Sequence, residues 1–208
     1  MKIIVFGATG SVGKEIVKQA LVNGYQVKAF VRDPKKIAHL SHPNLNVFEG
    51  DVLNPKNVEA AMQNQEVVLC AIGDGRAGKV RAEGTKNIIN AANKLGIKRL
   101  VCQTTLGLGS SQGNLNFVWK YIMFGFFLKK AFKDHQLQED HLFNCSLNYT
   151  IVRPSALTDG TITNNYKIGF DGKYNDLTLK ISREDVASFM LEQIDKTDYL
   201  KKAVSISN

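Results

Sequence analysis

The sequence predicts an α/β domain with a doubly wound, mostly parallel β-sheet. Short apolar runs of strand length alternate with helix-periodic segments, and the connections between them are short. A glycine-rich turn at residues 7–13 separates the first strand pattern from the first helix pattern. The chain has 208 residues, with no internal repeat and no low-complexity linker. Because this is the size of one domain with one substantial core, we expect residues 1–208 to form a single domain.

Each element follows from its local pattern and from the residues that border it. Gly24 and Gly96 each follow a helix pattern, and glycine readily adopts the backbone conformation that ends a helix. Asp33 and Asn54 each precede a proline, so we expect them to be the N-caps of helices. Strands are expected at residues 2–6, 25–31, 46–49, 66–72, 98–103, 149–152 and 203–206, and helices at residues 14–22, 55–62, 80–95 and 183–194.

The first strand, turn and helix have the context of a dinucleotide site in a Rossmann fold. Gly7 permits a tight exit from the strand, Gly10 lets the backbone approach a pyrophosphate, and Gly13 lets the helix pack close to the sheet. Free N–H groups at the start of the helix then face the phosphates. A Walker-type loop is excluded, because Glu15 stands where that loop needs Ser or Thr. A plain turn between strand and helix is the alternative.

The end of the second strand indicates which dinucleotide is bound. NAD sites usually carry Asp or Glu here for the ribose 2′-hydroxyl, whereas this chain has Arg32, with Lys35 and Lys36 close behind. A guanidinium can hold a 2′-phosphate through two hydrogen bonds. We therefore predict NADP(H) as the cofactor, with Arg32 and Lys36 at its extra phosphate. A solvated surface charge is the alternative for Arg32.

In doubly wound sheets, ligands lie beyond the carboxyl ends of the strands. Asp51 and Val52 follow the third strand and are expected to flank the adenine, the alternative being an Asp that stabilises a turn. Thr104 and Thr105 would place hydroxyls near the nicotinamide, unless they bond the local backbone. The expected cofactor-binding residues are Gly7, Thr9, Gly10, Ser11, Val12, Arg32, Lys36, Asp51, Val52, Ala71, Ile72, Gly73, Gln103, Thr104, Pro154 and Ala156.

Composition indicates the class of ligand and the cellular compartment. The net charge is +8, but the basic residues are scattered and no nucleic-acid motif is present, so we expect anionic small molecules and no nucleic acid. Cys70, Cys102 and Cys145 have no metal-ligand spacing, which indicates core thiols in a reducing compartment and no metal site. The first apolar run is too short for a signal peptide, and no segment has the length of a membrane span. A cytoplasmic protein is expected.

Six motifs spread over almost the whole chain carry a family resemblance. They are Phe6-Gly7-Ala8-Thr9-Gly10, Val31-Arg32-Asp33, Gly50-Asp51-Val52, Glu83-Gly84-Thr85-Lys86-Asn87-Ile88, Tyr149-Thr150-Ile151-Val152-Arg153-Pro154 and Ile181-Ser182-Arg183-Glu184-Asp185-Val186-Ala187. The chain resembles the atypical short-chain dehydrogenase/reductases, and within them the group of biliverdin-IXβ reductases and NADPH-dependent flavin reductases. The Arg-Pro strand exit is typical of the extended and atypical groups.

The resemblance implies roles for several residues. Thr9 and the three residues after it would contact the pyrophosphate, and Arg32 the 2′-phosphate. Thr105 matches a serine that faces the substrate and the nicotinamide in the biliverdin reductase. Ser155 stands where that reductase has histidine, which argues against the same tetrapyrrole activity. His135 matches the histidine of an Asp-His pair on the substrate side, the alternative being an exposed helix histidine. Thr105, Ser155 and His135 are the candidate catalytic residues.

The chain lacks the Tyr-x-x-x-Lys pair of the classical members, in which Lys lowers the pKa of Tyr so that the phenol can exchange a proton. A flavin or quinone needs no such acid, because its electron-poor ring accepts hydride directly. We therefore expect an NADPH-dependent reductase, monomeric or dimeric, of a flavin, quinone or tetrapyrrole-like planar acceptor. The alternative is a non-catalytic NADP(H)-binding sensor or an assembly or regulatory protein.

Residues 117–128 are unusually aromatic and are followed by Lys129, Lys130 and Lys133. They belong to the segments, about 105–145 and 154–180, that we expect to form the substrate side. Three interpretations are open: a helix that packs into the core, a mobile wall that stacks on a flat substrate, and a surface that faces a partner or the periphery of a membrane.

Overall fold

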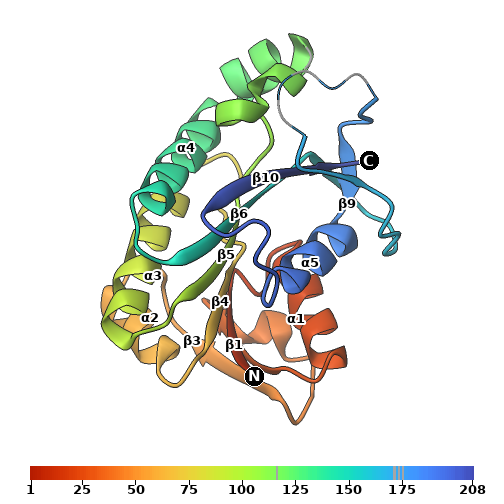
Figure 1. The fold of residues 1–208 in the computed structure, drawn as a ribbon. Helices are drawn as coiled ribbons and strands as arrows, with labels where there is room; N and C mark the ends of the chain where they lie inside the picture. Colours follow the sequence, from red (N-terminus) through yellow and green to blue (C-terminus); the bar gives the residue numbers. More distant parts are fainter. Residues whose placement is uncertain (116, 171, 173, 175) are drawn as a thin grey trace.

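The computed structural model describes residues 1–115, 117–170, 172, 174 and 176–208, with only the backbone described for residues 118–120 and 124. Helices cover both faces of one central sheet, and the two termini lie far apart (Figure 1). This confirms the predicted α/β architecture of a single domain with a mostly parallel sheet.

The central sheet has eight strands in the order β3-β2-β1-β4-β5-β6-β10-β8. Every neighbouring pair is parallel except β10 and β8, which are antiparallel. From β1 the chain first adds strands on one side and then returns to add β4 on the other, so the strand order reverses beside β1. The strands are β1 Lys2–Phe6, β2 Gln26–Val31, β3 Leu45–Glu49, β4 Val67–Cys70, β5 Arg99–Gln103, β6 Asn148–Pro154, β8 Lys167–Ile168 and β10 Lys202–Ser207.

Two apolar cores lie on the two faces of this sheet. Successive residues of β1 alternate between them, as the pleat of a strand requires: Ile3 packs in one core and Ile4 in the other. Helices α1 Gly13–Val22 and α5 Arg183–Glu192 pack together on one face. Helices α2 Pro55–Met62, α3 Arg81–Leu95 and α4 Lys129–Phe143 cover the other face (Figure 1).

The predicted helix boundaries agree with the structure to within two residues. Asn54 caps α2 by accepting hydrogen bonds from two backbone N–H groups, and Asp33 caps the short 3₁₀ helix η1 Pro34–Ile37. Gly96 ends α3 with φ +74°, a conformation that glycine adopts without strain. Cys70 and Cys102 are buried and face each other in register on β4 and β5, whereas Cys145 is half-buried.

The region after β5 contains elements that the sequence analysis did not predict. β7 Ala156–Thr158 and β9 Lys180–Ser182 form a separate two-stranded sheet, and η2 Gly109–Asn114 is a 3₁₀ helix. Each of these elements has at most six residues, so none shows a full period of apolar residues. β8 and α4 also belong to the elements absent from the prediction.

The aromatic segment forms η3 Val118–Phe127, a π-helix at the end of the molecule above α4 (Figure 1). Phe117, Tyr121 and Phe126 are exposed. The interpretation of this segment as a core helix is therefore wrong for its described side chains. Trp119 and Phe124 have side chains outside the described set. In the described part of the chain, no helix is both long and apolar enough to cross a membrane.

Candidate functional site

A cavity of about 560 Å³ opens beyond the carboxyl ends of β1, β4, β5 and β6. Each of these four strand exits contributes at least three consecutive residues to its wall. They are Gly10, Ser11 and Val12 after β1, Ala71, Ile72 and Gly73 after β4, Gln103, Thr104 and Thr105 at the end of β5, and Pro154, Ser155 and Ala156 at the end of β6. Leu115, Leu128 and His135 line it on the side of η3 and α4, and the wall also includes Gly75, Arg81, Leu106, Leu157 and Leu179. Most of the predicted site residues thus line one cavity.

The glycine turn gives the cavity a backbone floor. Gly7 has φ +81°, and a Cβ there would collide with the carbonyl of Ala71. A Cβ at Gly13 would collide with the carbonyl of Gly7, so the close packing of α1 against the strand end requires glycine. Among the described residues, no side chain caps the amino end of α1. The cavity therefore borders uncapped N–H groups and the positive end of a helix dipole.

The other predicted cofactor residues lie outside the cavity wall. Arg32 and Lys36 are exposed after β2, and Asp51 is exposed after β3. The two strand ends are joined by the bond from the Gly50 N–H to the carbonyl of Val31 (2.9 Å), which places Arg32 beside Asp51. Asp51 Oδ1 also accepts from the Leu53 N–H (2.9 Å), as the turn interpretation expects. Three further residues off the wall are Gly7, which shapes the turn, Thr9, which is exposed, and Val52, which is buried.

A buried ion pair supports the wall from behind. Glu139 on α4 accepts two hydrogen bonds from Arg153 on β6, from Nε (2.8 Å) and from Nη2 (2.6 Å). The Thr104 hydroxyl donates to Glu139 Oε1 (2.7 Å). Both charged side chains are at least 95% buried. The Thr104 hydroxyl is thus committed to Glu139, and its expected role beside the nicotinamide is reduced to backbone and methyl contacts.

Two of the candidate catalytic residues, Thr105 and Ser155, bring hydroxyl groups to the cavity. The Thr105 hydroxyl makes only a weak bond to the neighbouring Leu106 carbonyl (3.3 Å). Ser155 is 6% exposed, and within the described part of the chain its hydroxyl has no hydrogen-bond partner. Because buried hydroxyls are normally hydrogen-bonded, the Ser155 hydroxyl on the cavity wall fits a site that a polar ligand group completes.

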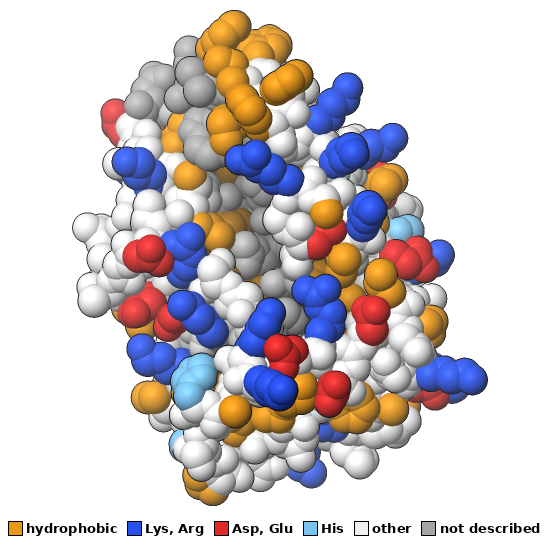
Figure 2. All heavy atoms as spheres, turned by 180° about the vertical axis from the view of Figure 1, so that it is seen from behind, with side chains coloured by type: hydrophobic (Ala, Val, Ile, Leu, Met, Phe, Trp, Pro, Cys, Tyr) orange, Lys and Arg blue, Asp and Glu red, His pale blue; other side chains and the backbone are white. Residues whose placement is uncertain are grey.

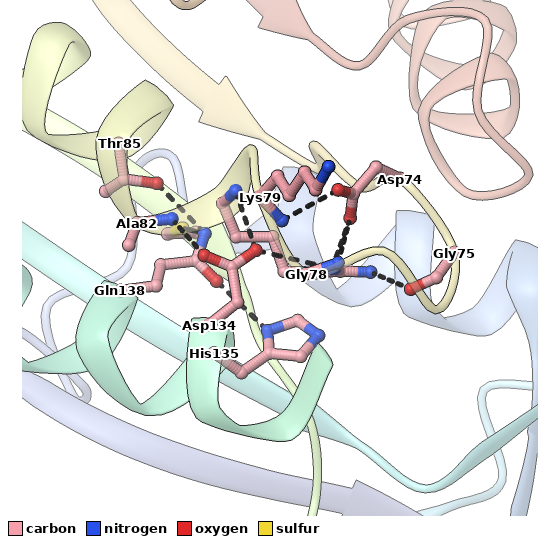
Figure 3. A network of polar contacts seen from close by, with 11 residues as sticks. Asp74, Gly75, Gly78, Lys79, Ala82, Thr85, Asp134, His135 and Gln138 are labelled. Carbon is pink, nitrogen blue, oxygen red and sulfur yellow. Dashed lines mark hydrogen bonds and ion pairs between the residues drawn. The ribbon is translucent and has the colours of Figure 1, made fainter. Parts of the chain in front are cut away.

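His135 reaches the cavity from α4, so its interpretation as an exposed helix histidine is wrong. Its Nδ1 lies 3.0 Å from Gln138 Oε1 (Figure 3). The Gln138 amide nitrogen donates to the Thr85 hydroxyl (3.0 Å) and to Cys102 Sγ (3.3 Å), which leaves its oxygen to face the imidazole. With this orientation of the Gln138 amide, Nδ1 of the neutral His135 ring donates to Oε1, and Nε2 is left as a hydrogen-bond acceptor. Burial and the nearby Arg81 guanidinium lower the pKa of His135 to about 4.

Arg81 anchors the loop beside His135. Its guanidinium donates to Asp74 Oδ1 (2.7 Å) and to the Gly75 carbonyl (3.2 Å). Asp134 on α4 accepts from the backbone N–H groups of Arg81 (3.0 Å) and Ala82 (2.9 Å), so a side chain from one helix caps the amino end of α3 (Figure 3). This fixes α4, and with it His135, against the start of α3.

The sequence analysis missed Glu139, Arg81 and Gln138 as site residues. The Arg-Pro exit signalled Arg153, but its partner Glu139 lies on another element, and local spacing cannot pair them. Among the described residues there is no group of three or more His, Cys, Asp or Glu side chains placed to hold a metal ion.

Known proteins resemble this chain over most of its length. Residues 7–197 match the NAD(P)H-binding family. An uncharacterized chloroplastic protein of Arabidopsis thaliana is 31% identical over 99% of this chain and 76% of its own length. The photosystem II assembly factor Ycf39 of Synechocystis is 24% identical over 99% of this chain, which spans 62% of that protein.

Solved structures share this fold over nearly the whole chain. ChuY of Escherichia coli O157:H7, described as an anaerobilin reductase, has a TM-score of 0.84 and is 25% identical over 99% of this chain and 96% of its own. The glycine turn, the uncapped helix and the cavity at the strand exits agree with the family match. The chain therefore belongs to the NAD(P)H-binding family, in a Rossmann fold shared with short-chain dehydrogenase/reductase-like oxidoreductases.

Proposed function

We propose that the protein is an NADPH-dependent reductase that transfers hydride to a planar acceptor such as a flavin or a quinone. The observation that carries the proposal is the single cavity that starts at the glycine turn and continues to Thr105, Ser155 and His135. It has room beyond the strand exits for a second ring against a nicotinamide. The likeness to ChuY, a structure described as an anaerobilin reductase, also supports the proposal of a reductase.

The proposed cofactor contacts lie partly in the cavity and partly at the exposed ends of β2 and β3 beside it. Gly10, Ser11 and Val12 would hold the pyrophosphate through backbone N–H groups at the start of α1. The 2′-phosphate would lie outside the cavity at Arg32 and Lys36, with the adenine near Asp51 and Val52. The nicotinamide would lie in the cavity, between the exits of β4, β5 and β6. Thr9 and Gly7 would shape the turn around the phosphates.

The residues of the wall would orient the rings and exclude water. The cofactor supplies the hydride, and the electron-poor acceptor takes it without a protein acid. Ser155 and Thr105 would donate hydrogen bonds to ring carbonyls or carboxamide groups. His135, neutral near pH 7, would accept one. Catalysis would come mainly from the alignment of two rings at contact distance.

Steady-state oxidation of NADPH with a panel of flavins, quinones and linear tetrapyrroles tests this function. Calorimetric titration with NADPH and NADH is the companion measurement, since it separates a failure to bind from a failure to turn over. We expect tight NADPH binding and turnover with at least one planar acceptor. NADPH binding without turnover of any acceptor would contradict the proposal.

A non-catalytic NADP(H)-binding regulator is the second candidate, because one relative is named as an assembly factor. Retention of a specific protein on immobilised NADPH-loaded chain, absent with the nucleotide-free chain, would favour it. A cytoplasmic location, a monomeric or dimeric state and the lack of nucleic-acid binding remain predictions from the sequence.

A further inference from the structure

The end of the molecule formed by η3 carries an apolar surface that we call the aromatic face. It consists of Phe117, Tyr121, Ile122, Phe126 and Phe127, whose exposed fractions run from 42% for Ile122 to 77% for Phe126. Hydrophobic side chains gather at the same end in the space-filling view, with basic side chains beside them (Figure 2). Large apolar side chains exposed together mark interaction surfaces more often than isolated ones do.

The rings of this face contact each other along the surface. The ring centroids of Phe117 and Tyr121 are 4.9 Å apart, and those of Phe126 and Phe127 are 5.2 Å apart. The backbone here is a π-helix, a rare conformation that is found frequently at functional sites. The aromatic face is thus an ordered set of rings presented outward.

Basic side chains flank the aromatic face along the chain. The sequence contains no Asp or Glu from residue 84 to residue 133. Lys129, Lys130 and Lys133 are exposed on the first turns of α4, directly after η3. The Arg76 guanidinium lies 6.0 Å from the centre of the Phe127 ring. The first acid beyond this stretch, Asp134, is buried and bonded to the start of α3.

We propose that the aromatic face binds the surface of an anionic lipid bilayer. Aromatic side chains are stable at the boundary between headgroups and acyl chains, and Lys and Arg beside them attract anionic headgroups. A bilayer offers both features at once. A second copy of the chain fits less well, because a symmetric contact through this face would bring the basic side chains of the two copies together. The exposed basic residues also match the sign of the +8 net charge.

This orientation places the cavity next to the bilayer. Leu115 and Leu128 stand just before and just after the residues of the aromatic face, and both line the cavity wall. The membrane-bound protein would therefore hold its cavity mouth at the lipid surface. The inference concerns binding alone and does not depend on the proposed reduction.

Sedimentation with lipid vesicles tests the inference without any nucleotide. We expect the protein to sediment with vesicles of phosphatidylcholine mixed with phosphatidylglycerol, and to bind far less to phosphatidylcholine alone. Binding should weaken as salt rises, because screening acts on the Lys–headgroup attraction. The double variant Phe126→Ser/Phe127→Ser should bind the vesicles at least about tenfold more weakly, since it loses two exposed rings that would be buried in the bilayer.

Two further variants make the result specific. The triple variant Lys129→Gln/Lys130→Gln/Lys133→Gln should lose the preference for anionic vesicles. Val22→Ser is the matched control, because Val22 is exposed on α1 on the opposite face of the sheet, and its binding should equal that of the parent. Circular dichroism and NADPH affinity report whether each variant is folded. Absence of vesicle binding would overturn the inference, as would a dimer in solution that the Phe126→Ser/Phe127→Ser variant abolishes.

Discussion

Replacing Glu139 by glutamine should cost a large part of the stability of this protein. Glu139 is 4% exposed and accepts three hydrogen bonds, two from Arg153 and one from Thr104. Glutamine has nearly the same shape but no charge, and it can present only one oxygen. The Arg153 guanidinium, 3% exposed, would then keep its charge in the interior without the carboxylate that compensates it.

Breaking a buried ion pair by removing one partner costs about 3–5 kcal/mol. For a domain of this size, that loss lowers the melting temperature by about 6–20 °C. Thermal and urea unfolding, followed by circular dichroism, measure the change. The double variant Glu139→Leu/Arg153→Met removes both charges, so we expect it to be more stable than Glu139→Gln.

Glu83→Gln is the matched control on the surface. Glu83 pairs with Lys86 on α3, and both side chains are about half exposed, so its loss should cost about 0.5 kcal/mol or less. If Glu139→Gln and Glu83→Gln lowered the free energy of unfolding equally, the buried pair would not stabilise the wall as argued here.

Three other changes test the site. The His135 pKa is about 4, against 6.5 for an ordinary histidine, so the unfolded chain binds the extra proton first. Protonation of His135 therefore does not affect stability above pH 6.5, and it lowers the free energy of unfolding by about 3 kcal/mol as the pH falls to 4. The variant His135→Asn should flatten this pH dependence in urea titrations. Arg32→Ala should weaken NADPH binding about tenfold or more in calorimetry and leave NADH binding nearly unchanged; equal losses would remove the 2′-phosphate assignment. Thr105→Val should lower turnover with little change in NADPH affinity, and unaltered turnover would limit Thr105 to a structural role.

Most of the fold was predictable because its signals are local. The strand β1, the turn that follows and helix α1 are specified by about twenty consecutive residues. The helix ends at Asn54 and Gly96 depend on single residues whose chemistry is unambiguous. The small sheet of β7 and β9 was not predictable, since Ala156–Thr158 and Lys180–Ser182 are too short to show a period and pair across more than twenty residues.

The candidate site also contains residues that local sequence signals predict and residues that they do not. The strand exits that line the cavity were predictable, because the carboxyl ends of parallel strands meet at one edge of the sheet. The groups behind that wall were not. Glu139 and Gln138 lie on a charged helix without a clear apolar stripe, and their partners Arg153 and Thr85 come from other elements. The aromatic segment was recognisable as unusual from its composition. Its exposure was not predictable, because it depends on how η3 is placed relative to the core.

The orientation of the Gln138 amide bears on the proposed acceptor, because it would leave Nε2 of His135 as a hydrogen-bond acceptor at the cavity. A carbonyl oxygen placed against Nε2 of His135 would meet a second lone pair, whereas an N–H would find a partner. Oxidised flavins carry such an N–H on the ring, and simple quinones carry only carbonyls. Under the proposed function, the orientation of one glutamine, four residues beyond Asp134, would therefore favour a flavin over a simple quinone of similar size and shape.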